Sequence, residues 1–207
     1  MKFAHNISRI EAFSDAVFAF AATLLVVSLG VENSDSIIEV DFKSFISFAV
    51  SFFVLVMLWY LHYNFFRRTD YMDNTIIAIN AVLLFVVLYY VFPLKSLINS
   101  WFMTKGMTPN KLASLFELYG IGFALIFLCL SLMYFRAFKK TRHLEQAMTL
   151  LFYTRHFAIF VAVALLSIGV AYVQIGLNFG LPGIIYSLLG PFCALHSYLF
   201  FKKFKIS

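Results

Sequence analysis

Residues 76–98 read IIAINAVLLFVVLYYVFPLKSLI, an apolar run in which Lys95 is the only charged residue. The hydrocarbon core of a bilayer is about 30 Å thick and is crossed by a helix of about 20 mainly apolar residues. This run is therefore predicted to cross a membrane. Five further runs of similar length occur in the chain, which gives the predicted spans 10–31, 45–66, 76–98, 112–138, 157–177 and 181–201.

The composition of the whole chain agrees with a membrane protein. Of its 207 residues 62% are hydrophobic and only 13% are charged, whereas about 25% of the residues of ordinary soluble domains are charged. Six spans with short connections use nearly the whole chain and leave no room for a separate soluble domain. We therefore expect an all-α, multi-pass membrane protein with a single six-helix transmembrane domain over residues 1–207.

The basic residues indicate how the spans are oriented. Although the net charge is +6, these residues lie between apolar runs and not on one face with interleaved aromatics, so no nucleic-acid partner is predicted. Most of them fall on one side of a six-span arrangement, and basic loops stay in the cytoplasm. Both termini are therefore predicted to be cytoplasmic, and the basic connection 136–155 is expected to contact anionic membrane lipid. The residues on that side are Lys2, Arg9, Arg67, Arg68, Arg136, Lys139, Lys140, Arg142, Arg155, Lys202, Lys203 and Lys205.

Sequence motifs of enzymes do not occur in the chain. The phosphate-binding pattern GxxxxGKS/T, the zinc pattern HExxH and the nucleophile pattern GxSxG are all missing from the sequence. The two cysteines, Cys129 and Cys193, lie in separate apolar runs and form no CxxC pair. His196 could relay protons in a transporter, but we interpret it as a buried structural histidine. The sequence argues against an enzyme and indicates no cofactor.

The first span differs from the others because polar residues enter it. Ser14, Asp15 and Thr23 interrupt an otherwise apolar helix, and polar residues inside a span point to function. At about 100° per residue, Ser14 and Asp15 point away from a face that could line a pore or could simply pack against other helices. The residues on that face are Arg9, Phe13, Ala16, Phe20, Thr23, Val27 and Val31.

The start of this span carries a recognisable motif. Residues 9–15 read RIEAFSD, which resembles the RxxxFSD signature that opens the first helix of the lysosomal-type potassium channel family and its prokaryotic members. The WxxH pair of Trp59 and His62, then Asp70, Asn80 and Pro93, are spaced as in that family. The resemblance covers the sequence as far as Pro93, and the second half matches only in its six-span layout.

The resemblance implies a homotetramer of single-repeat prokaryotic subunits in the cell membrane, with the first helix of each subunit lining a central pore for potassium. Phe20 falls where the family places an Ile or Leu that forms the narrowest hydrophobic ring, and Thr23 falls on its hydroxyl-bearing position. The implied pore-lining residues are Ala16, Phe20, Thr23 and Val27. The implied structural or gating network consists of Arg9, Phe13, Ser14, Asp15, Trp59, His62 and Asn80.

Three interpretations of function remain open at this point. The favoured one is a leak-type, potassium-preferring channel with a hydrophobic gate and a ring of threonine hydroxyls on its first helix. The second is a secondary transporter or a proton-conducting channel, and the third is a non-conducting membrane scaffold. Transporters typically contain broken helices and polar residues at the membrane midplane, for which only Pro93, Pro182 and Pro191 offer a hint.

Overall fold

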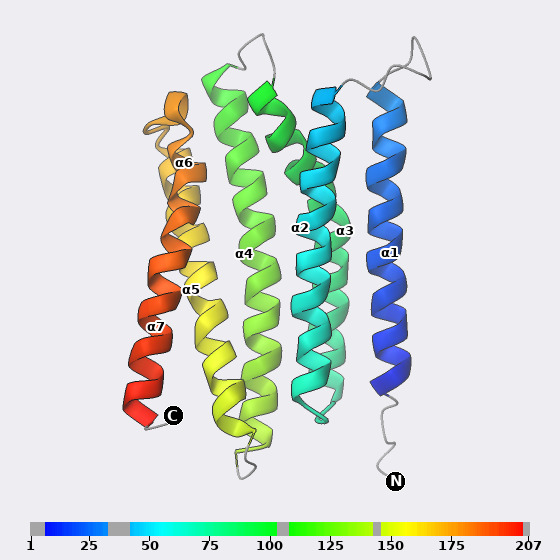
Figure 1. The fold of residues 1–207 in the computed structure, drawn as a ribbon, viewed down its shortest axis with the longest axis vertical. Helices are drawn as coiled ribbons and strands as arrows, with labels where there is room; N and C mark the ends of the chain where they lie inside the picture. The colour runs from blue at the N-terminus through cyan, green and yellow to red at the C-terminus, as the bar shows by residue number, and fades with distance from the viewer. Residues whose placement is uncertain (1–6, 33–41, 103–107, 143–145, 205–207) are drawn as a thin grey trace. The chain divides into compact units, whose positions relative to one another are not determined.

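All secondary structure in the residues that the structure describes is helical (Figure 1). The structure is a computed structural model, and it describes residues 7–32, 42–102, 108–142 and 146–204, with all of their side chains except those of 29–32, 43, 101 and 102. The elements in chain order are α1 (Ile7–Glu32), α2 (Phe42–Arg68), α3 (Asn74–Phe102), α4 (Pro109–Lys140), α5 (Ala147–Tyr172), the 3-10 turn η1 (Leu177–Phe179), α6 (Leu181–Ile184), the 3-10 turn η2 (Ile185–Leu188) and α7 (Leu189–Phe204).

The prediction of six spanning helices is confirmed. Six helical stretches of the described chain are long and apolar enough to cross a membrane. Because a helix rises about 1.5 Å per residue, each of them exceeds the thickness of a bilayer core. They are Ile7–Ser28, Ser44–Arg68, Asn74–Ser100, Pro109–Lys140, Ala147–Tyr172 and Leu181–Phe204.

The six spans group into two compact units, and the single six-helix domain over residues 1–207 stays a prediction. The first unit covers Met1–Met107 and the second covers Thr108–Ser207. Within the first unit α1, α2 and α3 pack on one another, and within the second unit α4, α5, α6 and α7 do so. Each unit thus contains three of the six spans and buries its own set of apolar side chains.

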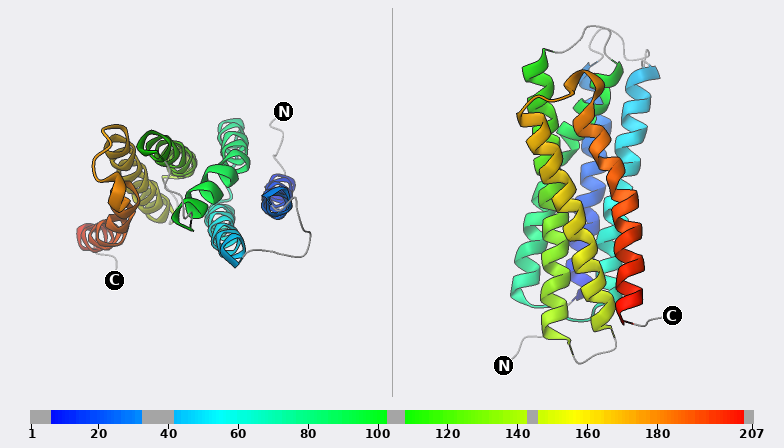
Figure 2. Two further views of the ribbon diagram at one scale, coloured as in Figure 1. Left: turned by 90° about the horizontal axis from the view of Figure 1, so that it is seen from above. Right: turned by 90° about the vertical axis from the view of Figure 1, so that its left-hand side faces the viewer.

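In the first unit the three helices run side by side (Figures 1 and 2). Ser14, Phe18, Ala21 and Leu25 form the buried stripe of α1, and none of them is more than 5% exposed. Their spacing of four, three and four residues places them on one face of a helix. This stripe faces α2 and α3, which are the helices that α1 contacts in its unit.

Helix α3 continues through Pro93. Proline has no backbone N–H, so the carbonyl group four residues earlier loses its helical hydrogen bond and the helix tends to kink. The C-terminal part of α3 leans away from the axis of its N-terminal part in Figure 1. The bend therefore changes the direction in which the following side chains, above all that of Lys95, leave the helix.

In the second unit α4 and α5 pack along most of their length. Aromatic rings fill their interface: the Phe127 centroid lies 4.4 Å from that of Phe160 and 5.7 Å from that of Phe157. At Gly120 the two helices approach so closely that a Cβ atom would lie 2.6 Å from Cγ1 of Ile168. Ring packing and a glycine contact therefore set the geometry of this pair.

The fifth span begins earlier than predicted, at Ala147 and not at residue 157, and ends at Tyr172 and not at 177. Thr154 and its polar neighbours lower the local hydropathy, which made this stretch resemble part of a loop. The Thr154 hydroxyl donates to the Leu150 carbonyl at 2.8 Å, so the polar group is satisfied inside the helix. Most of the predicted connection 136–155 is therefore helical.

The turn after α5 contains left-handed backbone. Gln174, Gly176 and Gly180 have φ angles of 57°, 65° and 66°, which an α-helix cannot accommodate. The sixth span then starts with α6 and η2 before it continues as α7. The Ser167 hydroxyl of α5 donates to the Pro182 carbonyl of α6 at 2.8 Å and ties this broken beginning to the unit.

Candidate functional site

Helix α1 has two opposite faces in its unit. Ser14, at 0% exposure, belongs to the buried stripe. The other face carries the predicted pore-lining residues: Phe20 is 56% exposed, Val27 is 58% exposed, and Ala16 and Thr23 are exposed as well. The structure therefore places all four on one side of α1 that no helix of its own unit covers.

A chain of hydrogen bonds joins the buried face of α1 to α2 and α3. The amide oxygen of Asn80 can only accept, so the Nε2–H group of His62 donates to it, at 2.7 Å. Asn80 Nδ2 donates to the Ser14 hydroxyl at 3.0 Å, and that hydroxyl donates to the Ile10 carbonyl at 2.8 Å. His62 and Asn80 are 1% and 4% exposed. The bond between Asn80 and Ser14 joins α1 to α3 and thereby favours one rotation of α1 about its own axis, and the His62 bond holds Asn80 in place.

A second polar contact lies one residue further along α1. The indole N–H of Trp59 donates to Oδ1 of Asp15 at 2.7 Å, and Asp15 also interacts electrostatically with His62. An unpaired aspartate at the centre of a spanning helix costs about 2.5–3.5 kcal/mol on insertion scales. The tryptophan N–H and the nearby imidazole compensate part of this cost.

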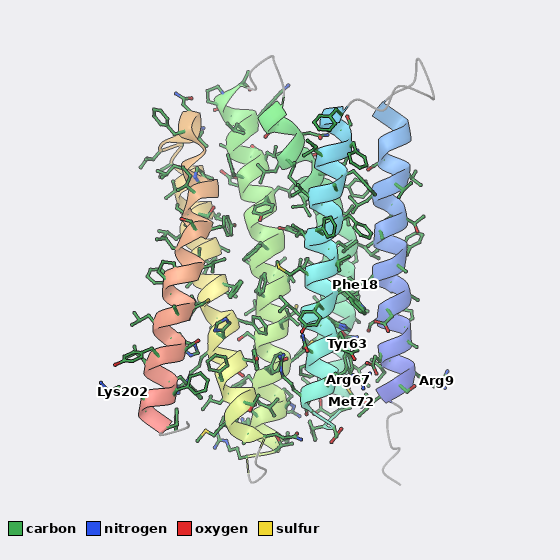
Figure 3. The ribbon with its side chains drawn as sticks, in the orientation of Figure 1. Arg9, Phe18, Tyr63, Arg67, Met72 and Lys202 are labelled. Atoms are coloured by element: carbon green, nitrogen blue, oxygen red, sulfur yellow. The ribbon has the colours of Figure 1, made fainter. Side chains whose placement is uncertain are left out.

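Aromatic rings surround the hydrogen-bonded histidine. The ring centroids of Phe18 and Phe66 lie 5.4 and 5.0 Å from that of His62. Figure 3 shows Phe18, Tyr63 and Arg67 between α1 and α2, on the side where the two helices face each other. In such an apolar surrounding hydrogen bonds are stronger than in water, and a broken one is more costly.

Arg9 and Phe13 belong to the predicted network but lie elsewhere on α1. Both are exposed, and both line a groove of about 460 Å³ whose other walls come from α3 and include Asn80. Figure 3 shows Arg9 on the side of α1 that is turned away from α2. The structure therefore brings together Ser14, Asp15, Trp59, His62 and Asn80, while Arg9 and Phe13 border this cluster from the α3 side.

Sequence reasoning missed an ion pair at the same end of the unit. Arg67 Nη2 lies 3.8 Å from Glu11 Oε1, and the Arg67 guanidinium lies 4.8 Å from the Tyr63 ring centroid. The Arg67 side chain is 62% exposed, so the pair is accessible to solvent. The available signal was an acidic residue near the start of the first span and two arginines at the end of the second.

Sequence reasoning also missed a contact at the other end of α1. Lys95 of α3 is only 4% exposed. Its Nζ atom donates to the Ser28 carbonyl at 2.8 Å and to the Ser28 hydroxyl at 3.1 Å. A cation near the C-terminus of a helix is stabilised by the helix dipole. The available signal was that Lys95 is the only charge in its apolar run.

The polar groups of this site orient helix α1. Among the described residues, no three His, Cys, Asp or Glu side chains come together as a metal centre requires. Hydrogen bonds join the polar groups of the cluster across three helices, while Nδ1 of His62 is buried without a hydrogen-bond partner among the described residues. They hold α1 near its start, and Lys95 holds it near its end, while the opposite face stays exposed.

Comparison with known proteins identifies the family. Residues 9–93 match the model of the family described as "Endosomal/lysosomal potassium channel TMEM175". A protein of Marivirga tractuosa named "Potassium channel" is 33% identical over 220 residues, which cover 95% of this chain and 88% of that protein. The chain belongs to the TMEM175 potassium channel family. This confirms the resemblance read from the RxxxFSD motif, and it assigns the chain to a family of channels and not of enzymes.

Solved TMEM175 structures have the same fold. A variant of the potassium channel MtTMEM175, in complex with a nanobody–MBP fusion protein, superposes with a TM-score of 0.76 at 31% identity, covering 94% of this chain and 93% of that one. A lysosomal potassium-selective channel TMEM175 homologue from Chamaesiphon minutus gives a TM-score of 0.60 at 22% identity, over 88% of this chain and 97% of that one. The second likeness concerns the fold alone.

Proposed function

We propose that this chain forms a homotetrameric, leak-type cation channel that prefers potassium, with α1 of each subunit lining one central pore. The observation that carries the proposal is the exposed face of α1, which lies opposite the buried stripe and contains Ala16, Phe20, Thr23 and Val27. A membrane helix with one face fixed by hydrogen bonds and the other unpartnered is suited to meet copies of itself. The relatives and solved structures named as potassium channels support the choice of ion.

In the proposed pore, four Phe20 side chains form the hydrophobic gate and four Thr23 hydroxyls form a polar ring. Hydrophobic constrictions gate channels by excluding water, and oxygen ligands replace part of the hydration shell of an ion. The Thr23 hydroxyl donates its hydrogen to the Ala19 carbonyl at 3.1 Å. The lone pairs of the Thr23 hydroxyl oxygen can then coordinate a cation in the proposed pore. Such a ring favours potassium, which gives up its hydration shell more readily than sodium.

Phe20 makes this pore different from that of most of the family, in which an aliphatic residue is expected at the constriction. A phenyl ring is bulkier than Ile or Leu, and its face attracts cations. Closely spaced rings therefore restrict conduction sterically while they stabilise an ion that enters. We expect a small conductance with moderate selectivity.

The proposed location is the plasma membrane of a prokaryote, with both termini in the cytoplasm and the spans in contact with lipid. Each unit carries basic residues at one end, as the positive-inside rule requires of cytoplasmic ends. In the first unit Arg67 and Arg68 end α2 next to the start of α1, where Glu11 lies. The bacterial origin of the relatives agrees with a prokaryotic channel. Potassium is the permeant ion, and no cofactor is proposed.

The test is cation flux into proteoliposomes that contain the purified tetramer, first under a potassium gradient and then under a sodium gradient. Phe20→Ala is expected to raise potassium flux by about tenfold or more, because it removes the constriction, and Thr23→Ala is expected to lower the ratio of potassium to sodium flux. Val26→Ala is the matched control, since Val26 is 55% exposed but is turned about 100° from Val27. It should behave as the wild type.

Other outcomes would favour the other interpretations. Proton flux without potassium flux would indicate a proton-conducting channel, and saturable transport that is coupled to a second solute would indicate a secondary transporter. If intact tetramers of every variant conducted no ion, the protein would be a scaffold. If Val26→Ala altered selectivity as strongly as Thr23→Ala, the exposed face of α1 would not be the pore wall.

A further inference from the structure

An apolar groove with a histidine on its wall lies in the second unit, away from the α1 network. It has a volume of about 500 Å³ and is formed by α5 and α7 alone. Small-molecule sites commonly fall between about 300 and 1,000 Å³, with mainly apolar walls and a few polar groups that orient the ligand. The lining residues are Ile159, Ala162, Val163, Leu166, Phe192, Leu195, His196 and Leu199.

His196 is chemically unusual in this groove. Neither of its ring nitrogens has a hydrogen-bond partner within the described part of the chain, although both are buried. Nδ1 of His156 is also buried without a hydrogen-bond partner in the described residues. The ring centroids of His156 and His196 are 5.6 Å apart. A buried polar group without a partner lowers stability and needs an explanation. One such side chain on the wall of an apolar groove, with a second one next to it, points to a ligand that has a polar end.

The surroundings define the charge of that polar end. Arg155 is exposed on α5 beside His156, and it interacts electrostatically with His196. Further toward the same end of the unit lie the basic residues Lys202 and Lys203, which close α7. Positive charge therefore accumulates from the histidines to the end of the unit, which favours an anionic group.

The direction of the groove defines the apolar part of the ligand. On α5 the lining residues Ile159, Val163 and Leu166 follow His156 toward the C-terminal end of the helix, away from the basic end of the unit. Val163 and Leu166 lie about 10 and 15 Å from His156 along the helix at 1.5 Å per residue. A ligand with its anionic end near Arg155 would thus extend a chain of carbons over these side chains.

We infer that the groove between α5 and α7 binds one acyl chain of an anionic membrane lipid, whose headgroup region accepts hydrogen bonds from His196 and Arg155. Because the imidazole already lines the groove, a turn about its Cβ–Cγ bond directs a ring nitrogen to an ester or phosphate oxygen. The apolar wall provides the contacts for the chain. This binding needs no ion conduction, so its test stands apart from that of the proposed pore.

The experiment is native mass spectrometry of the purified full-length protein, titrated with palmitoyl-oleoyl phosphatidylglycerol or with the corresponding phosphatidylcholine. The wild type should retain about one phosphatidylglycerol per subunit and bind phosphatidylcholine more weakly. Ala162→Trp fills the groove from an exposed position and should weaken phosphatidylglycerol binding by about tenfold. His196→Phe keeps the aromatic shape but removes the nitrogens, and it should abolish the preference for the anionic lipid.

Leu165→Trp is the matched control. Leu165 is 59% exposed on the same helix and does not line the groove, so this variant should bind lipid as the wild type does. Equal binding by Ala162→Trp and Leu165→Trp would overturn the inference. A change of oligomeric state in Ala162→Trp alone would overturn it too, because the groove would then hold a second copy of the chain. Retained lipid preference in His196→Phe would remove the proposed headgroup contact.

Discussion

The helices within the first unit are joined by a different kind of contact from the helices within the second unit. In the first unit hydrogen bonds between side chains far apart in the sequence join α1 to α2 and α3, as between Trp59 and Asp15. In the second unit stacked and tilted aromatic rings join α4 to α5, as between Phe127 and Phe160. One hydrogen bond between these two helices runs from the Ser131 hydroxyl to the backbone carbonyl of Thr154.

This difference matters because the membrane provides little preference for one rotation of a helix over another. Lipid tails are as apolar as leucine side chains, so apolar contact alone selects an orientation only weakly, whereas hydrogen bonds are directional. The proposed pore helix α1 must present one particular face, and its unit has the directional bonds. The second unit needs mainly close contact between helices, which rings and Gly120 supply.

The largest effect is expected from Asn80→Leu, which removes the middle of the hydrogen-bond chain. The buried Nε2–H group of His62 loses its acceptor, and the Ser14 hydroxyl keeps only its bond to Ile10, at about 1–3 kcal/mol for an unsatisfied buried donor. Thermal unfolding of the detergent-purified protein should shift accordingly, and potassium flux should fall as α1 loses its orientation. Val82→Leu on the exposed side of α3 is the control, and equal unfolding midpoints for the two variants would refute the role of Asn80.

Gly120→Ala tests the second unit at its closest helix contact. The new methyl group would meet Ile168 Cγ1 at 2.6 Å, and such overpacking typically costs about 1–3 kcal/mol. The gain in helix propensity of about 1 kcal/mol offsets part of this cost. Gly169→Ala, at a position with open space around it, should show the gain alone. Both measurements use thermal unfolding, and ion selectivity should remain unchanged in both variants.

Lys95→Met probes the second attachment of α1. It removes two interhelical hydrogen bonds to Ser28, and such bonds average about 0.6 kcal/mol each in membranes. We expect a loss of stability of about 1 kcal/mol with unchanged selectivity, because the network at the start of α1 stays intact. Ser96→Ala, an exposed neighbour, is the control. A selectivity loss larger than that of Asn80→Leu would show that Lys95 orients the pore face more strongly than the network does.

The smallest effect is expected from Glu11→Gln. The ion pair with Arg67 is 3.8 Å long and one of its side chains is 62% exposed, and exposed pairs contribute about 0–1 kcal/mol. The unfolding midpoint should change little at physiological salt, and any change should vanish at high ionic strength because salt screens exposed charges. A shift as large as that of Asn80→Leu, independent of salt, would place this pair among the orienting contacts.

Much of the fold could be predicted from the sequence. Span length and hydropathy are properties of single segments, so six helices followed from the apolar runs without knowledge of any contact. The beginning of α5 was placed too late because Thr154, Arg155 and His156 lower the hydropathy, although a helix can satisfy the threonine hydroxyl internally. Hydropathy measures transfer into lipid and not the backbone hydrogen bonds that define a helix end.

The candidate site was predictable in part. The motif at residues 9–15 and the WxxH pair marked Ser14, Asp15, Trp59 and His62 through resemblance, and the structure joins them by hydrogen bonds. Arg9 was expected in the same cluster, and its exposed side chain lines a groove together with Asn80 of that cluster, so its membership stays a prediction. The partner of Lys95 could not be predicted. A lysine in an apolar run must donate hydrogen bonds to some acceptors, but the sequence does not indicate which residues provide them.

The two attachments of α1 have a mechanical consequence. Ser14 and Ser28 are bonded to α3 and are separated by about 21 Å along the helix. A rod that is clamped near both ends is stiff at the clamps and bends most easily midway between them. Phe20 lies almost at that midpoint. The proposed constriction therefore occupies the most compliant part of the pore helix, where a small bowing of the backbone changes the distance between opposite rings without breaking either attachment.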